Sequence, residues 1–339
     1  MSLKPVEGFT SLQTHHCVTG SMRHIYAFYG HDLSEDLLLG LGEGVGFIYW
    51  SMKSQPPFMG GRAAPKPGME ALAGQRTGVR IEAHTTASVR KAHLTLLELL
   101  DANQPVMLQV DMGFLPYFDF GGEEYHFGGH VVVACGYDPN TEQVLIADRD
   151  GIHSVPLANL EQARGSTCKP FPPCNCWWTF DFSQYRYPDS DEVRQAIAAQ
   201  AAGMLTPPIH NFGIKGIRLA AKRIPAWPSQ MTAEEIRMAL FNAHILISPL
   251  GGTGGGIFRY IFSRFINEAA AITGEPRLSE SADEFKRIGD AWEALASWAK
   301  KTSTTPDPAA HLGECAAPLL AIADQEQIAW ETLQQLIGK

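Results

Sequence analysis

One cysteine stands where the sequence is expected to pass from a loop into an amphipathic helix. After Cys17, apolar residues at Val18, Met22, Ile25 and Tyr29 follow helical spacing. The N-terminus of a helix presents free N–H groups and positive partial charge, which favour a thiolate and stabilise the oxyanion formed when a carbonyl is attacked. Cys17 is therefore the candidate nucleophile. The alternative is a small buried thiol, which is a common setting for a free cysteine.

His130 and Asp148 are the candidate base and the carboxylate that orients it. His130 opens a predicted strand over 130–137, and Asp148 ends a second over 143–148. The turn over 138–141 joins them as a hairpin, which places the start of the first strand beside the end of the second. In the ideal register across this turn, His130 and Asp148 are one residue away from facing each other. A bulge, or one residue more or fewer at the turn, is therefore needed to put both side chains on one face. Cysteine, histidine and carboxylate then make a set suited to acyl transfer.

Other residues compete for these roles. His126 is the nearest alternative base and Asp150 the nearest alternative carboxylate. Gln13, four residues before the cysteine, offers a side-chain amide as a second oxyanion donor. Without a catalytic role, His130 would be a satisfied histidine at a strand edge and Asp148 a carboxylate that caps a turn.

The elements that must position these residues indicate an α+β first domain and a mostly helical second one. Residues 51–78 are rich in Pro, Gly and Met and are interpreted as a long excursion, and residues 165–188 as irregular. From residue 189 onward the pattern is almost wholly helical, so the predicted domains are 1–188 and 189–339. The remaining predicted elements are a helix capped by Ser34, a helix over 88–103, a strand over 105–111, a strand near 151–155 and a helix over 157–164.

Composition limits the classes of function. The 339 residues suffice for about two domains. The formal net charge of −9 argues against general nucleic-acid binding, which needs a basic surface. No stretch has the length and apolarity of a membrane span, and the first residues lack an apolar signal core, so a cytoplasmic location is expected. Six cysteines in so long a chain do not form a disulfide framework. Three of them, Cys168, Cys174 and Cys176, do not match a zinc pattern, so neither metal nor cofactor is predicted.

Several stretches carry a family resemblance. The segment HHCVTGSMRHIYAFYGHDLSEDLLLGLGEGVGFIYW, followed by HFGGHVVVACGYD and VLIADRD, resembles the N-terminal domain of the butirosin-biosynthesis acyltransferase family. The segment GGTGGGIFRYIFSRFINEAAAITG resembles the helical domain that commonly follows it. The resemblance implies a papain-like fold with Cys17 as nucleophile, His130 as base and Asp148 as orienter. Related papain-like peptidases place the oxyanion glutamine further from the cysteine than Gln13, which makes His16 a competing donor.

The activity implied by this resemblance is transfer of an acyl or aminoacyl group from a thioester to a small-molecule amine. The donor would be an acyl carrier protein or another acyl thioester, in the biosynthesis of a secondary metabolite. One alternative is a papain-like peptidase or amidase, in which water takes the place of the amine. Another is a non-catalytic binding module on the same scaffold, which predicts that the three side chains do not converge.

Two features of the second domain suit an anionic donor. A glycine run opens a helix that carries Arg259, and free N–H groups beside an arginine suit a phosphate such as that of phosphopantetheine. The alternative is a close-packed or flexible connection. Lys215, Arg218 and Lys222 share one helical face that would suit an acidic carrier protein, although a solvated helix face is the more common explanation of such a pattern. The predicted substrate-binding set is Gly251, Gly252, Thr253, Gly254, Gly255, Gly256 and Arg259.

Overall fold

The computed structural model describes residues 3–52, 55–122, 125–169 and 171–338. Their contacts divide the chain into two compact units, which we describe separately. The first unit comprises residues 1–38 and 77–186, and the second comprises residues 39–76 and 187–339. The second unit therefore takes in an early segment as well as the C-terminal helices, because two strands, formed by residues 45–52 and 55–62, pack against three of those helices. A contiguous division near residue 188 stays a prediction.

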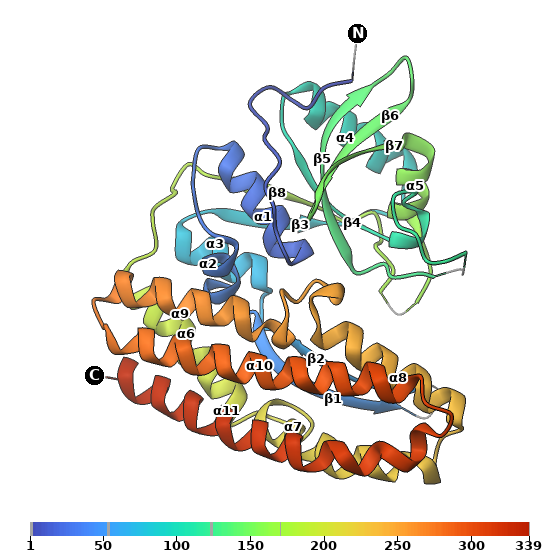
Figure 1. Ribbon diagram of the computed structural model, residues 1–339. Helices are drawn as coiled ribbons and strands as arrows, with labels where there is room; N and C mark the ends of the chain where they lie inside the picture. The colour runs from blue at the N-terminus through green and yellow to red at the C-terminus, as the bar shows by residue number, and fades with distance from the viewer. Residues whose placement is uncertain (1–2, 53–54, 123–124, 170, 339) are drawn as a thin grey trace. The chain divides into compact units, whose positions relative to one another are not determined.

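The first unit is built on a six-stranded antiparallel sheet in the order β3-β8-β4-β5-β6-β7 (Figure 1). Helix α1 packs along β5, while α4 and α5 bury leucines such as Leu96 and Leu160 in a core shared with β4, β5 and β6. The central strands are buried along almost their whole length, which explains the apolar runs of their sequences. The elements of this unit are α1 (Cys17–Phe28), β3 (Arg80–His84), α4 (Val89–Asp101), β4 (Val106–Val110), β5 (His130–Asp138), β6 (Gln143–Asp148), β7 (Gly151–Pro156), α5 (Leu157–Gly165) and β8 (Trp177–Asp181).

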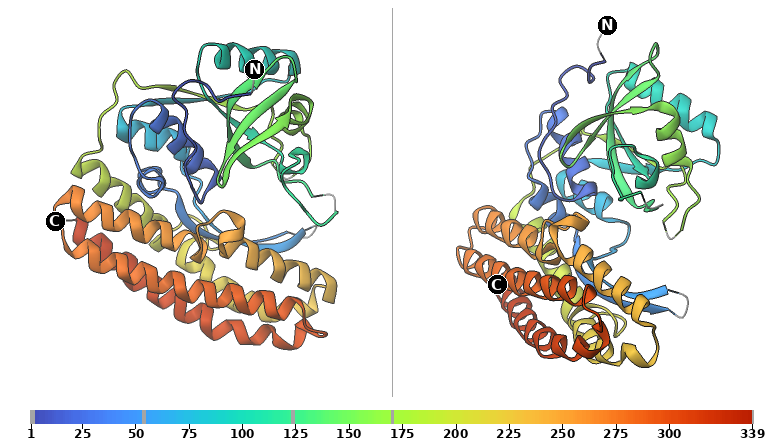
Figure 2. Two further views of the ribbon diagram at one scale, coloured as in Figure 1. Left: turned by 45° about the horizontal axis from the view of Figure 1, so that its top comes forward. Right: turned by 45° about the vertical axis from the view of Figure 1, so that its right-hand side comes forward.

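The second unit is a helical assembly that holds one β-hairpin. The long helices α10 and α11 run side by side in both views of Figure 2. An aromatic core of Phe262, Phe285 and Trp330 packs in edge and tilted contacts with ring centroids 4.7 Å apart. The elements of this unit are β1 (Val45–Met52), β2 (Gln55–Arg62), α6 (Ser190–Leu205), α7 (Gly213–Arg223), α8 (Ala233–Ile247), α9 (Arg259–Thr273), α10 (Arg277–Ser303) and α11 (Ala316–Ile337). Two short helices cross the divisions of the chain between the units. Helix α2 (Glu35–Leu41) crosses the division after residue 38, and α3 (Met69–Thr77) crosses the one after residue 76.

The predicted α+β class is confirmed, and most elements lie close to their predicted bounds. Two interpretations were wrong. Residues 51–78 are not a long excursion, because they contain the whole of β2 and α3, and residues 165–188 contain β8. Glycine and proline in β2 and the short apolar run of β8 conceal strands that form only by pairing with distant partners. In the described part of the chain, no helix has the length and apolarity needed to cross a membrane.

Candidate active site

Cys17 is the first residue of α1, and a buried carboxylate holds the loop that leads into it. Glu35 accepts hydrogen bonds from the backbone N–H groups of His15, at 2.8 Å, and His16, at 2.6 Å, and from the Thr19 hydroxyl, at 3.2 Å. Burial raises the pKa of Glu35, and the two backbone N–H groups oppose that rise. The loop is therefore anchored at two consecutive residues immediately before the nucleophile candidate.

A β-bulge in β5 decides which face of the sheet His130 occupies. Between the turn and the bulge, Gly136 pairs with Leu145, whereas beyond it Ala134 pairs with Ile146, so that Cys135 is an extra residue. Continuing that register puts the residue two places after His130 opposite Asp148. Because alternate residues of a strand share a face, the bulge places His130 and Asp148 on the same face. The hairpin thus contains a bulge, which is one of the two ways that the sequence analysis gave for bringing these side chains to one face.

His130 and Asp148 form a buried, charge-assisted pair. The Nε2 atom of His130 lies 2.7 Å from Oδ2 of Asp148, and the two side chains are only 4% and 3% exposed. Burial acts to lower the pKa of His130, but the Asp148 charge and hydrogen bond outweigh it and raise the pKa to about 9. Burial likewise acts to raise the pKa of Asp148, yet the attraction of His130 lowers it to about 2. At neutral pH this pair is an imidazolium and a carboxylate.

The Cys17 side chain completes the set. It is hydrogen-bonded to His130, and this contact also raises the pKa of the imidazole. Because Nε2 of His130 is engaged with Asp148, Nδ1 is the ring nitrogen left to serve the thiol. Cys17 itself is partly exposed, whereas both of its partners are buried. The imidazole therefore lies between a reachable sulfur and a fixed carboxylate, which is the order that nucleophilic catalysis needs.

Two aromatic residues that sequence analysis did not identify surround the pair. The Tyr117 hydroxyl donates to the Oδ2 atom of Asp148 at 3.0 Å, the same oxygen that faces His130. Phe118 places its ring edge-on to His130, with centroids 5.4 Å apart. Tyr117 in turn stacks on the ring of His153, with centroids 3.9 Å apart. Both aromatics follow a single turn of 3-10 helix outside any periodic pattern, so no signal in the sequence marked them.

The two candidate oxyanion donors are both used locally. The Gln13 amide donates to the carbonyl of Arg149 at 3.0 Å, which ties its loop to the residue after Asp148. His16 is the N-cap of α1, and its Nδ1 lies 3.0 Å from the Thr19 hydroxyl. The His16 side chain therefore caps the N-terminus of α1. The amide of Gln13 keeps a second N–H and remains the side-chain candidate, together with the backbone N–H groups at the start of α1.

The competing base and carboxylate have other partners. His126 pairs with Asp111 through Nδ1 at 3.0 Å. Asp150 pairs with His153 at 2.8 Å. Among the described residues, the structure thus brings Cys17, His130 and Asp148 together and leaves both alternatives in other pairs.

The glycine run of the second unit is a close-packed connection, contrary to the expected anion cradle. Arg259 is fully buried, and its guanidinium binds the Glu326 carboxylate through two hydrogen bonds of 2.8 Å. The backbone N–H of Gly256 donates to Glu293 at 2.6 Å, so a carboxylate of the protein already lies against the loop. A Cβ atom at Gly256 would lie 2.7 Å from the backbone of Gly289. Arg259 and the loop are therefore bound and packed within the protein, and these contacts do not support a phosphate site there.

The basic helical face is only partly available. Arg218 of α7 forms an ion pair with Asp324 at 2.7 Å, whereas Lys215 and Lys222 are exposed. The expected docking of an acidic carrier protein on this face stays a prediction.

Comparison with known proteins identifies two family regions. The family model described as "Butirosin biosynthesis protein H, N-terminal" matches residues 16–149, a span that begins one residue before Cys17 and ends one residue after Asp148. The model described as "Domain of unknown function (DUF4872)" matches residues 158–333. No curated protein matches the chain. The first region thus encloses every member of the hydrogen-bonded set.

Proposed function

Because the chain belongs to the DUF4872 family over residues 158–333, and its residues 16–149 match the family model of the N-terminal region of butirosin biosynthesis protein H, we propose that it is a cysteine-dependent acyltransferase. It would move an acyl or aminoacyl group from a thioester, such as that of an acyl carrier protein, to the amine of a small molecule. One observation carries the proposal: the Cys17 thiol is hydrogen-bonded to His130, which is paired at 2.7 Å with Asp148.

The reaction proceeds in two balanced halves. In the reactive form His130 already holds the proton of the Cys17 thiol as an imidazolium, and the Cys17 thiolate attacks the thioester carbonyl to form a carbon–sulfur bond. Collapse of the oxyanion expels the donor thiol, which leaves with the proton held by His130. The acceptor amine then attacks the acyl-enzyme while His130 removes its proton, and Cys17 is released as the amide forms. N–H groups at the start of α1 are positioned to stabilise both oxyanions.

A hydrolase is the second candidate, since the same residues would form the same acyl-enzyme. In that case water attacks in the second half-reaction, and an amide or peptide is the substrate. The hydrogen-bonded set argues against a non-catalytic module, which has no need for a buried imidazolium–carboxylate pair beside a thiol.

Intact mass tests the first half-reaction. The protein is incubated with an acyl thioester, and we expect a mass gain of one acyl group that Cys17→Ala abolishes. Cys174→Ser is the matched control, because Cys174 is an exposed thiol that could exchange non-specifically with a thioester. A gain that survives Cys17→Ala would remove Cys17 as the nucleophile.

The fate of the adduct separates the two candidate functions. We expect the acyl group to leave much faster when amines are added than in buffer alone, with the amide as product. Loss to water at a rate that amines do not change would favour the hydrolase.

A further inference from the structure

A second group of cysteine, histidine and aspartate lies in the first unit, apart from the proposed catalytic set. Asp111 follows β4, His126 lies in the segment before β5, and Cys168 follows α5. One ligand atom from each side chain lies within 4.8 Å of the ligand atoms of the other two. No metal was predicted because no further ligand adjoins the cysteines in the sequence, whereas Asp111 and His126 lie more than 40 positions before Cys168.

The geometry of this group is convergent, unlike that of a catalytic relay. In a catalytic relay the imidazole lies between the thiol and the carboxylate. The sulfur is then roughly 7 Å from the carboxylate oxygen, because two hydrogen bonds of ~3 Å and the width of the ring separate them. Here the sulfur of Cys168 lies within 4.8 Å of an Asp111 oxygen as well as of a His126 nitrogen. All three side chains therefore point at one place, as the ligands of a metal ion do.

The surrounding structure holds these ligand atoms in place. The Oδ1 atom of Asp111 accepts the backbone N–H groups of Gly113 and Phe127, both at 3.0 Å. Its Oδ2 atom lies 2.6 Å from the Ser166 hydroxyl, which also accepts the backbone N–H of Cys168 at 3.2 Å. The Ser166 hydroxyl thus links two of the candidate ligands, as outer-shell groups do in metal sites.

His126 reaches the group only because residue 113 is glycine. A Cβ atom at Gly113 would lie 2.6 Å from Nδ1 of His126 and 2.3 Å from the carbonyl oxygen of Tyr125. The Nδ1 atom is 3.0 Å from Oδ2 of Asp111, and the ring rests against Phe114 with centroids 5.0 Å apart. The close approach of this histidine to a fully buried carboxylate is therefore built into the backbone.

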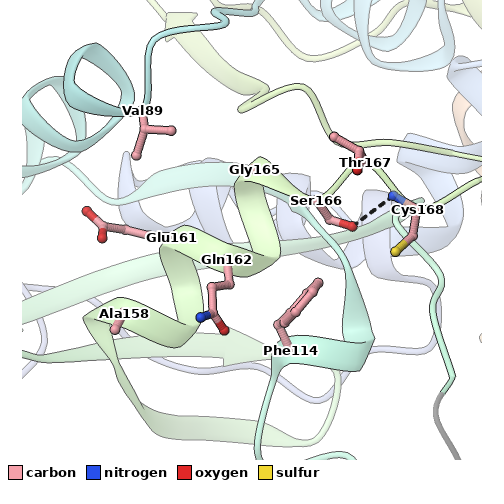
Figure 3. Close-up of a pocket in the computed structure, with 9 residues that line it drawn as sticks. All are labelled: Val89, Phe114, Ala158, Glu161, Gln162, Gly165, Ser166, Thr167 and Cys168. Atoms are coloured by element: carbon pink, nitrogen blue, oxygen red, sulfur yellow. Dashed lines mark hydrogen bonds between the residues drawn. The ribbon is translucent and has the colours of Figure 1, made fainter.

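The group adjoins a pocket of about 550 Å³ whose lining includes Phe114, Glu161, Ser166 and Cys168 (Figure 3). Figure 3 shows Cys168 beside Ser166 at this pocket, joined by the hydrogen bond from the backbone N–H of Cys168. Three protein ligands leave a tetrahedral ion with one further position. The pocket provides room for a water or a small ligand at that position.

We propose that Asp111, His126 and Cys168 form a binding site for a divalent transition-metal ion of the zinc type. A thiolate, an imidazole and a carboxylate together suit Zn²⁺ or Co²⁺, whereas Mg²⁺ and Ca²⁺ prefer oxygen ligands alone. Binding forms bonds from the metal to sulfur, nitrogen and oxygen, and it releases the thiol proton to solvent. A neutral His126 ring keeps its single proton on the nitrogen that does not coordinate, whereas a doubly protonated ring releases one proton to solvent. Affinity for the metal therefore rises with pH.

Cobalt absorption tests the site directly. Metal-free full-length protein carrying Cys17→Ala is titrated with Co²⁺, so that the catalytic set cannot supply a sulfur ligand. We expect one equivalent to bind with a sulfur-to-cobalt charge-transfer band, and Zn²⁺ to displace it. Cys168→Ser should abolish the charge-transfer band, and His126→Gln should weaken Co²⁺ binding at least tenfold.

Cys174→Ser is the matched control and should keep both the band and the affinity, because Cys174 is exposed and lies outside the group. Circular dichroism of each variant shows whether it is folded, and His126→Gln provides a second route should Cys168→Ser unfold. Absence of the band in the parent protein, or a band at full strength in folded Cys168→Ser, would overturn the proposal. Neither result bears on acylation of Cys17, which is measured separately.

Discussion

At the scale of single residues, the site depends on a proton held between His130 and Asp148. The pKa of His130 is raised from 6.5 to about 9, so the pair's contribution to the free energy of unfolding is complete below about pH 6.5 and is lost as the pH rises through about 9. For Asp148 the direction is opposite. Its contribution is present above about pH 3.8 and is lost as the pH falls through about 2.

Asp148→Asn tests this charge coupling through the pH dependence of acylation. Above the pKa of His130 the imidazole has no proton for the leaving thiol, so we expect the single-turnover rate of the wild type to fall above about pH 9. In the pH–rate profile, this fall at high pH is the alkaline limb. Without the Asp148 charge, the alkaline limb should move down by about 1–3 pH units. A limb that stays at the wild-type pH would show that another group sets it.

Tyr117→Phe should move the same limb in the other direction. The Tyr117 hydroxyl stabilises the charge of Asp148, so its loss makes the carboxylate a stronger acceptor for His130. We expect a slightly higher alkaline pKa and an acylation rate lower by roughly tenfold or less, since a hydrogen bond is worth about 1 kcal/mol. Tyr137→Phe, on the same hairpin and outside the site, is the control. A downward shift like that of Asp148→Asn would contradict this role.

At the scale of elements, two local devices deliver the reactive groups. The bulge at Cys135 turns His130 onto the face of Asp148, and the Glu35 carboxylate fixes the loop that precedes α1. Both devices act on the backbone, so neither the Cys135 nor the Glu35 side chain needs to touch a substrate. They are positioning devices whose removal should change the placement of the catalytic groups as well as stability.

Glu35→Gln should destabilise the first unit and slow acylation. The amide keeps one acceptor but turns an N–H₂ group toward a buried backbone N–H, so we expect the free energy of unfolding to fall by about 1–3 kcal/mol. Urea unfolding measures the stability and single-turnover acylation measures the placement of Cys17. The exposed Asp32 provides the control, since Asp32→Asn should change stability by no more than about 0.5 kcal/mol. Equal effects of the two substitutions would refute the role of Glu35.

At the scale of the whole molecule, the two compact units use charge differently. The first unit buries its ion pair beside a reachable thiol, whereas the second buries one in an aromatic core. There Glu326 accepts both Arg259 hydrogen bonds and the indole N–H groups of Trp292, at 2.9 Å, and Trp330, at 3.0 Å. All hydrogen-bonding positions of this carboxylate are used within the protein, so the pair serves the fold of the helical unit.

Glu326→Gln should therefore be strongly destabilising. It leaves the Arg259 guanidinium buried without a countercharge, and we expect a loss of about 3–5 kcal/mol in the free energy of unfolding. Arg218→Ala breaks a pair to the same helix, but that pair is exposed and should contribute no more than about 1 kcal/mol. Tryptophan fluorescence during urea unfolding compares the two variants. Similar losses in both would contradict a special role for the buried pair.

The features that depend on short-range chemistry could be predicted from the amino-acid sequence. Helical periodicity placed Cys17 at the start of α1, and the turn over 138–141 defined the hairpin that carries His130 and Asp148. These features depend on neighbouring residues, because periodicity, capping and turn preferences act over a few positions.

The contacts between side chains that are distant in the sequence became visible in the folded protein. The tertiary structure placed the bulge that aligns His130 with Asp148, brought Tyr117 against that carboxylate and turned Arg259 inward to Glu326. It also gathered Asp111, His126 and Cys168. The pairing of distant strands and the packing of loops set these contacts, and no local pattern encodes them because the partners are far apart in the chain.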